Sequence, residues 1–104
     1  MSRRTFVVPG THACLPGHFP GRPLVPGVVI LDRVVAAIEA EHGPVGAMRL
    51  PQVKFVQPLA PDETAEITLE AAPVGDDTRW RFRVERAGVL LASGDVVIAG
   101  SPTA

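Results

Sequence analysis

Cysteine is scarce in this chain, since Cys14 is its single example. One cysteine excludes an internal disulfide and is typical of a reducing compartment, so we expect the protein to be cytoplasmic. An excess of charge of one sign is also lacking. Ten lysine and arginine residues are balanced by eleven aspartate and glutamate residues, which gives a net charge of −1. This balance argues against broad nucleic-acid binding.

Long hydrophobic runs are lacking as well, and no stretch approaches the roughly 20 apolar residues that a bilayer-spanning helix needs. The opening residues 1–4 are followed only by a short apolar run that ends at Pro9 and Gly10, so we expect no targeting segment and no membrane association. A phosphate-binding glycine loop, a Gly-x-Ser-x-Gly elbow and a Cys/His metal cluster are also missing, so we expect no metal site.

The length and composition favour a small globular protein. The chain has 104 residues, of which 46% are hydrophobic, enough for one domain or for half of an obligate pair. So small a chain has a thin core, and a second subunit would help to bury apolar surface. We expect a single domain over residues 1–104, with residues 100–104 as a frayed tail.

Proline and glycine are concentrated in residues 9–27, which we expect to form a loop long enough to be functional. A short strand over residues 5–8 precedes this loop. The sequence then predicts a helix from about Pro26 to about His42, with Gly43-Pro44 as its stop. Because this helix is apolar on nearly every side, we expect it to be buried.

The second half of the chain has the period of two that is typical of strands, interrupted by hairpin turns at residues 75–77 and 87–88. One buried helix followed by an antiparallel meander predicts an α+β fold in which the sheet curls around the helix. The expected strands cover residues 47–57, 64–71, 79–84 and 89–99. In the third of these, Trp80, Phe82 and Val84 should face the helix, and Arg79, Arg81 and Arg83 the solvent.

Asp32 is the first candidate for chemistry. A carboxylate among apolar neighbours is costly to bury in its ionised form, so we expect a raised pKa and a group able to donate a proton. The alternative is that Asp32 pairs with an arginine, or lies where the helix emerges into solvent. Its neighbours at helical spacing are Val28, Val29, Val35 and Ala36.

His18 and Gly27 are the other two candidates. The backbone of His18 is restricted by Gly17 and by Phe19-Pro20, so its ring could serve as a general base, or could simply bond to a carbonyl group. Gly27 lets a ligand approach the first helical turn, where free N–H groups lie at the positive end of the helix dipole. Such a donor could stabilise an oxyanion, or Pro-Gly could be a plain helix-start turn.

The remaining candidates carry weaker signals. His12 and His42 have no partner at metal-ligand spacing, so we expect both at the surface. Cys14 has no evident activating base, which favours an inert thiol. The arginines of the third strand are typical of a solvated strand face, although such a row could also dock an acidic partner.

Residues 18–27, HFPGRPLVPG, with an acid fourteen residues after the histidine, resemble the hotdog-fold β-hydroxyacyl-acyl carrier protein dehydratases, the FabZ/FabA family. Lys54-Phe55, Pro58 and Pro61-Asp62 are also similar to that family's strand after the helix and the turn that follows it. The resemblance covers roughly residues 5–99. It implies a hotdog domain, a long helix wrapped by an antiparallel sheet, that forms homodimers or multiples of dimers.

The resemblance also implies a reaction and a shared site. The substrate would be a 3-hydroxyacyl thioester on the phosphopantetheine arm of acyl carrier protein, dehydrated to a trans-2-enoyl thioester without metal or cofactor. His18 of one subunit would be the base, and Asp32 of the other subunit the acid. The Gly27 amide would bind the thioester carbonyl, and Phe19, Gly21 and Val28 would complete the substrate-binding set.

The chain departs from the family pattern at several points. Arg33 and Ala36 differ from the residues that usually follow the acid, Asp32 is typical of the FabA branch while HFPG is typical of FabZ, and we expect no opening helix. Two alternatives therefore stay open. One is a hotdog acyl-thioesterase. The other is a non-catalytic hotdog subunit that pairs with an active dehydratase, because Arg33 could hold Asp32 ionised.

Overall fold

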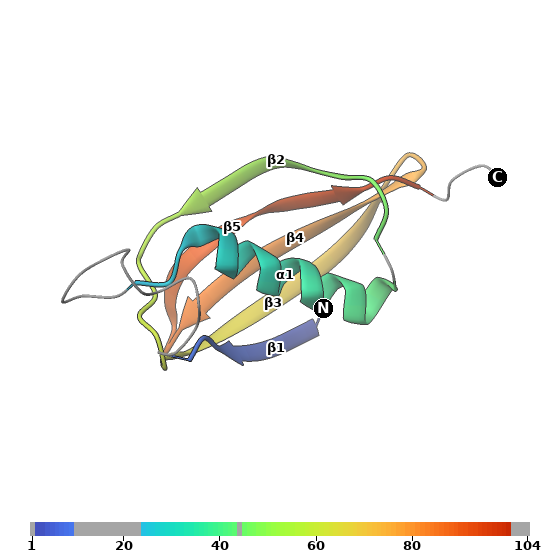
Figure 1. Ribbon diagram of the computed structural model, residues 1–104. Coiled ribbons are helices and arrows are strands. Elements are labelled where there is room, and N and C mark those ends of the chain that lie inside the picture. Colours follow the sequence, from blue (N-terminus) through green and yellow to red (C-terminus); the bar gives the residue numbers. More distant parts are fainter. Residues whose placement is uncertain (1, 10–23, 44, 101–104) are drawn as a thin grey trace.

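The computed structural model describes residues 2–9, 24–43 and 45–100, and shows a helix lying along one face of an antiparallel sheet (Figure 1). Five strands form this sheet in the order β1-β3-β4-β5-β2. The α+β prediction and the helix-on-sheet arrangement of a hotdog domain are thus confirmed. The elements are β1 Ser2–Val7, α1 Gly27–His42, β2 Met48–Phe55, β3 Thr64–Val74, β4 Asp77–Arg86 and β5 Val89–Ile98.

The predicted meander is correct for β3, β4 and β5, but wrong for β2. The strand after the helix does not lie beside β3; it pairs with β5 at the opposite edge of the sheet from β1 (Figure 1). The physical reason is the helix, which lies along the sheet between β1 and β2. The chain that leaves the helix therefore joins the edge that β1 does not occupy.

The strands β3 and β4 extend beyond their predicted bounds, because the hairpin that joins them is long. β3 and β4 pair as far as Val74 opposite Asp77, leaving only residues 75–76 as the turn. Ala87 and Gly88, at φ of 48° and 82°, close the β4–β5 hairpin with the two left-handed residues that match the strand twist. The β1 strand is displaced toward the N-terminus, to residues 2–7, because its pairing with β3 begins at Ser2 opposite Leu69.

The helix begins and ends close to the predicted residues. Pro26 is its N-cap, and its carbonyl accepts from the Val29 amide at 3.0 Å. At the other end Gly43, at a φ of 98° that favours glycine, donates its amide to the Glu39 carbonyl at 2.8 Å. The expected burial on all sides is wrong, because only one face can rest on the sheet. The buried residues are Val29, Ile30, Val34, Ala37 and Ile38.

The core lies between that helix face and the inner face of the sheet. Phe82, Ile38 and Leu69 are each at most 1% exposed there. Trp80, Phe82 and Val84 face the helix as predicted, while Arg81 and Arg83 are exposed on the opposite face. Gly100, placed in the expected frayed tail, donates its amide to Asp77 Oδ1 at 3.0 Å, so the chain is held up to that residue.

Replacing Phe82 by alanine tests whether this helix–sheet core holds the fold together. The side chain is 0% exposed, so truncation leaves a cavity and should lower the free energy of unfolding by about 3–5 kcal/mol. Urea unfolding followed by circular dichroism measures this change. Val89, which is 44% exposed, provides the control, since Val89→Ala should change stability by less than about 0.5 kcal/mol. Equal losses for both variants would contradict the packing described here.

Candidate active site

An open cavity of about 460 Å³ lies at the N-terminal end of α1. Its wall is mostly apolar, and most of it comes from the end of β2 and the segment that follows. Cavities of this size and character bind small organic ligands. The lining residues are Val25, Gly27, Ile30, Phe55, Val56, Gln57, Pro58 and Leu59.

Gly27 and Phe55 are in direct contact at this cavity. A methyl group built on Gly27 would lie 2.8 Å from Phe55 Cζ, so the ring occupies the space that any larger residue at position 27 would need. The ring is nevertheless 53% exposed, and its outer side faces open space. A larger residue at position 27 would therefore have to displace the exposed Phe55 ring, whereas the backbone φ of Gly27 does not itself call for glycine.

Backbone hydrogen bonds fix the two walls of the cavity to each other. The Val25 amide donates to the Leu59 carbonyl at 2.8 Å, which ties the residues just before α1 to the segment after β2. The Val56 and Gln57 amides both donate to the Leu91 carbonyl, at 2.7 and 3.2 Å. The helix start, the end of β2 and the beginning of β5 therefore meet at one place.

The start of α1 is suited to bind negative charge. No side chain of the described residues caps it, and the first turn carries no acidic residue. The first amides of a helix have no partner within the helix, and they lie at the positive end of its dipole. Gly27 is the first residue of α1 and lines the cavity, as its predicted role requires. An oxyanion placed there would meet backbone donors.

Asp32 is exposed in this chain, which confirms the alternative that it lies where the helix meets solvent and contradicts burial among its apolar neighbours. The reason is its position on the helix, since Val28, Asp32 and Ala36 follow at intervals of four and share the face turned away from the sheet. Arg33 does not form an ion pair with Asp32 among the described residues. Its guanidinium lies 5.9 Å from the centroid of the Phe6 ring, in a cation–π contact with β1.

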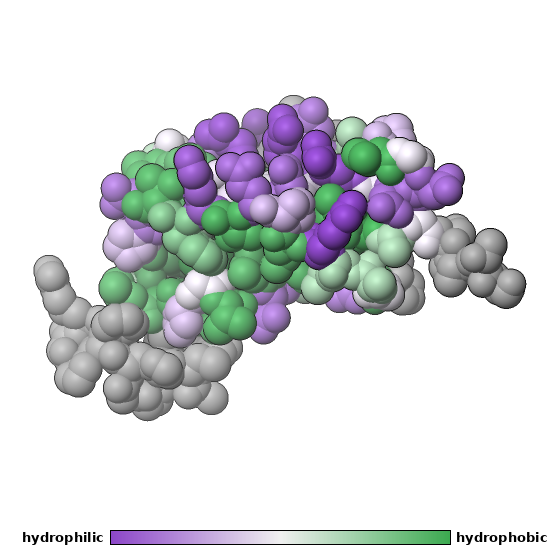
Figure 2. All heavy atoms as spheres, turned by 90° about the horizontal axis from the view of Figure 1, so that it is seen from above, coloured by the Kyte–Doolittle hydropathy of each residue, from purple (hydrophilic) through white to green (hydrophobic). Residues whose placement is uncertain are grey.

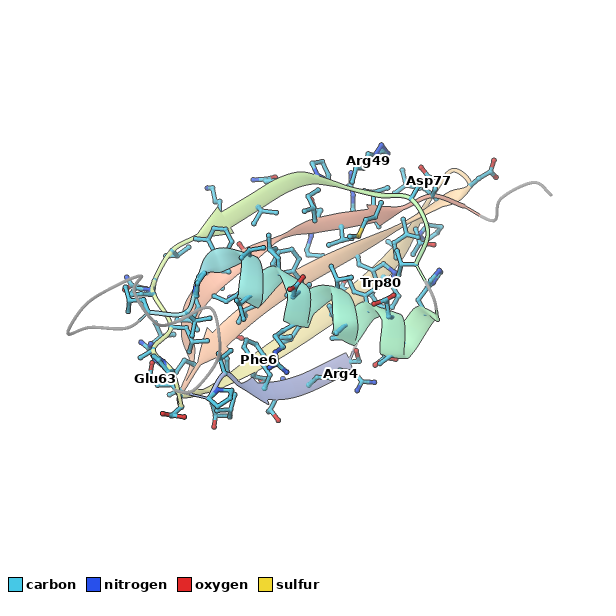
Figure 3. The ribbon with its side chains drawn as sticks, in the orientation of Figure 1. Arg4, Phe6, Arg49, Glu63, Asp77 and Trp80 are labelled. Carbon is cyan, nitrogen blue, oxygen red and sulfur yellow. The ribbon has the colours of Figure 1, made fainter. Side chains whose placement is uncertain are left out.

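The other residues considered for the site do not line this cavity in the described part of the chain. His18, Phe19 and Gly21, together with His12 and Cys14, fall outside the described residues. Val28 is 64% exposed and is not part of the cavity wall. His42 is exposed, as expected, and its ring meets Trp80 edge-on at 6.4 Å. Figure 3 shows Trp80 toward the C-terminal end of α1.

Large apolar side chains are exposed along β2 and beside it. Met48, Leu50, Phe55 and Val56 are 41–53% exposed, and with Val28 they form what we call the β2 apolar patch. Figure 2 looks onto this edge of the sheet, and shows hydrophobic residues on the helix side and hydrophilic residues on the outer side. β2 is an edge strand without a single buried residue.

The described parts of the chain contain neither a group of metal ligands nor a helix of membrane-spanning length. Within residues 2–9, 24–43 and 45–100, no three His, Cys, Asp or Glu side chains are grouped so that they could hold a metal ion. In the same residues, no helix is long and apolar enough to cross a bilayer, and α1 has only 16 residues.

Comparison with known proteins identifies the family. A family model described as the ApeI dehydratase matches residues 2–95. The chain belongs to the ApeI-like dehydratase family. This match covers β1, α1 and most of the sheet, so the resemblance to hotdog dehydratases is confirmed. The matched range includes the residues that line the cavity and the positions of the predicted site residues.

Curated relatives of this ApeI-like chain are named 3-hydroxyacyl-[acyl-carrier-protein] dehydratase FabZ. The protein from Bradyrhizobium sp. (strain ORS 278) is 29% identical over 96 residues, covering 80% of this chain and 62% of the relative. The protein from Methylobacterium sp. (strain 4-46) is 31% identical over 93 residues, covering 77% and 56%. The chain thus spans about three fifths of the length of the relatives it matches.

Solved structures show the same fold. In the dehydratase heterocomplex ApeI:P from Xenorhabdus doucetiae, one chain matches with a TM-score of 0.71 and 22% identity, over 93% of this chain and 85% of that one. The fluoroacetyl-CoA thioesterase FlK matches with a TM-score of 0.68 and 18% identity, over 94% and 82%. Because dehydratase and thioesterase share this architecture, the fold does not decide the reaction.

Sequence reasoning missed most of the cavity wall. The sequence marked Phe55 and Pro58 only through their similarity to the dehydratase family. It gave no functional role to the other lining residues Val25, Ile30, Val56, Gln57 and Leu59. The available signal was the apolar, proline-containing run over residues 55–59, which follows a strand and contains no turn glycine. A strand end that continues with apolar residues favours a covered or ligand-lined segment.

A double-mutant cycle tests the contact between Gly27 and Phe55. In a Phe55→Ala background, Gly27→Ala should stabilise the protein by up to about 1 kcal/mol, because alanine favours helix over glycine. With Phe55 present, the same change should be neutral or destabilising, since the new methyl group would lie 2.8 Å from the ring carbon. Urea unfolding of the four proteins gives the coupling free energy, expected at about 0.5–3 kcal/mol. Additive effects would show that the ring does not rest on Gly27.

Proposed function

We propose that this protein dehydrates 3-hydroxyacyl thioesters, carried on the phosphopantetheine arm of acyl carrier protein, to trans-2-enoyl thioesters. The observation that carries the proposal is the apolar cavity whose wall includes Gly27, the first residue of α1. An acyl chain can lie in the apolar part. The thioester carbonyl can then meet backbone donors at the helix start.

The reaction needs three groups, and the chain supplies a candidate for each. His18 removes the C2 proton as general base, and the Gly27 amide binds the enolate oxygen that develops on the thioester. Asp32 protonates the departing C3 hydroxyl group, which leaves as water. General acid–base steps contribute about 10²–10⁴-fold each, and an oxyanion donor about 10²–10³-fold. These steps require no metal or organic cofactor.

The exposure of Asp32 supports a site shared between two subunits. An exposed carboxyl group beside exposed Val28 and Ala36 is a poor general acid alone, because water surrounds it. A second subunit that covers this helix face would exclude water and would bring its own His18 to Asp32. We therefore propose a homodimer, or a multiple of dimers, in which each site takes its base and its acid from different chains.

The β2 edge supplies the surface for that dimer. The outer side of an edge strand offers backbone donors and acceptors to another strand. On β2 the exposed side chains of the β2 apolar patch lie beside that edge. The opposite edge, β1, presents the charged residues Arg3 and Arg4 instead, which disfavour pairing. Pairing of two β2 strands would make one continuous sheet and would bring two Val28–Asp32 helix faces together.

The direct test mixes the purified protein with a 3-hydroxyacyl acyl carrier protein and follows the acyl group by mass spectrometry. The proposal expects loss of one water. His18→Ala and Asp32→Asn should each reduce the rate by at least about 10²-fold, because each removes a proton-transfer group. His42→Ala and Glu39→Gln, an exposed histidine and an exposed acid of α1, are the matched controls and should keep full activity. Full activity in both site variants would exclude this assignment.

A charged substitution on β2 tests the dimer. Leu50→Glu places a carboxylate on the β2 apolar patch and should shift the protein toward monomers, with loss of dehydration. Val74→Glu is the control, because Val74 is also 41% exposed but lies at the end of β3. Sedimentation velocity of the two variants measures the change. A Leu50→Glu protein that stays dimeric and active would place the interface elsewhere.

Two other functions have specific observations in their favour. The likeness to the thioesterase FlK supports acyl-thioester hydrolysis, for which the same mass spectra would show free acid instead of water loss. The likeness to a chain of the ApeI:P heterocomplex supports a subunit that works only with a different partner chain. In that case the purified protein alone would leave the substrate unchanged.

A further inference from the structure

Arg86, at the end of β4, contacts the segment that forms one wall of the cavity. Its Nη1 donates to the Pro58 carbonyl at 3.0 Å and to Glu63 Oε1 at 3.1 Å. The same Glu63 oxygen accepts from the Ala60 amide at 2.9 Å. One guanidinium and one carboxylate therefore connect β4 to both halves of residues 58–63. Figure 3 shows Glu63 at the end of the molecule where α1 begins.

The same segment, residues 58–63, is hydrogen-bonded to the residues just before α1. Pro58, whose carbonyl Arg86 holds, is followed by Leu59, and the Leu59 carbonyl accepts from the Val25 amide at 2.8 Å. Val25 lies two residues before Gly27. A continuous series of hydrogen bonds and peptide units thus runs from Arg86 to the residues that lead into α1, and Arg86 itself is not part of the cavity wall.

We propose that Arg86 and Glu63 are a pair of positioning residues that set the start of α1 against the cavity. The role that we assign to them rests on the proposed function, because a donor at Gly27 matters only if a thioester binds there. Loops are more mobile than the elements they connect, and small displacements of a catalytic donor cost much of the rate. Charge-assisted hydrogen bonds from one guanidinium to two oxygens restrain such a loop better than neutral ones.

The surroundings of the pair distinguish it from the other surface ion pairs. The Arg86 side chain is 29% exposed and reaches a backbone carbonyl as well as a carboxylate. Arg81 and Asp95 form a comparable pair at 3.5 Å, but the Arg81 side chain is 66% exposed and lies on the outer face of the sheet. Arg81 is therefore the matched control for Arg86. The competing explanation is that Leu59, which is 0% exposed, holds the segment by packing alone.

Amide hydrogen exchange at Val25, measured by NMR, tests the role without any substrate. In Arg86→Met, the Val25 amide should exchange about tenfold faster or more, because the Leu59 carbonyl is less firmly held. Arg86→Lys should recover part of the protection, since its ammonium group can bond one of the two oxygens. Arg81→Met should leave Val25 unchanged. The Phe82 amide, in the middle of β4, should be unaffected in all three variants.

Steady-state kinetics then separate positioning from binding. Arg86→Met should lower kcat for dehydration at least several-fold with a smaller change in KM, because the displaced donor acts mainly on the transition state. Val25 exchange equal to that of the wild type, or an equal rise at Phe82, would overturn the proposal. If the wild-type protein dehydrates no 3-hydroxyacyl thioester, the proposed function fails, while unprotected Val25 in Arg86→Met would still show that Arg86 holds the helix start.

Discussion

The packing of one face of α1 on the inner face of the sheet is the contact on which the rest of the structure depends. Val34 and Phe82 are both 0% exposed at this contact, and Ile38 is 1% exposed. Because that face cannot turn away from the sheet, the opposite face must point outward. The same constraint sets the helix start at the end of β2, where Gly27 meets Phe55, and sets Asp32 on the outer side.

That arrangement leaves two surfaces of a single chain uncovered, and one second subunit could cover both. The outer helix face combines a carboxyl group with exposed apolar side chains, and β2 is an unpaired edge with the β2 apolar patch beside it. On the proposed account a second subunit covers both surfaces and adds its own His18. Burial of apolar surface, closure of a sheet edge and assembly of a catalytic site would then be one event, which suits a chain with so thin a core.

Much of the fold could be predicted from local sequence signals. Pro26 and Gly43 limit α1 because each has a backbone property that a helix interior does not tolerate, and alternation in β4 places Trp80, Phe82 and Val84 inward. The position of β2 could not be predicted in this way. The order of the strands depends on where the chain leaves the helix in space. No short-range sequence pattern predicts that position.

The candidate site was also predictable only where local sequence signals determine it. The position of Gly27 at the helix start follows from local rules. The motif at residues 18–27 indicated the family, and the family model that matches residues 2–95 confirms it. Burial and exposure of Asp32 both stayed open, because helical neighbours within one chain do not show which face meets the sheet. The cavity wall at residues 55–59 and the contacts of Arg86 depend on tertiary packing over long sequence separations.

The central claim is that each active site joins His18 of one chain to Asp32 of another, and subunit complementation tests it most directly. His18→Ala and Asp32→Asn proteins, each inactive alone, would be unfolded together, refolded as a mixture and given a 3-hydroxyacyl acyl carrier protein. Random pairing makes half of the dimers mixed, each with one intact site, so dehydration should return to about a quarter of the wild-type rate. A refolded, dimeric mixture that stays inactive would contradict the shared site.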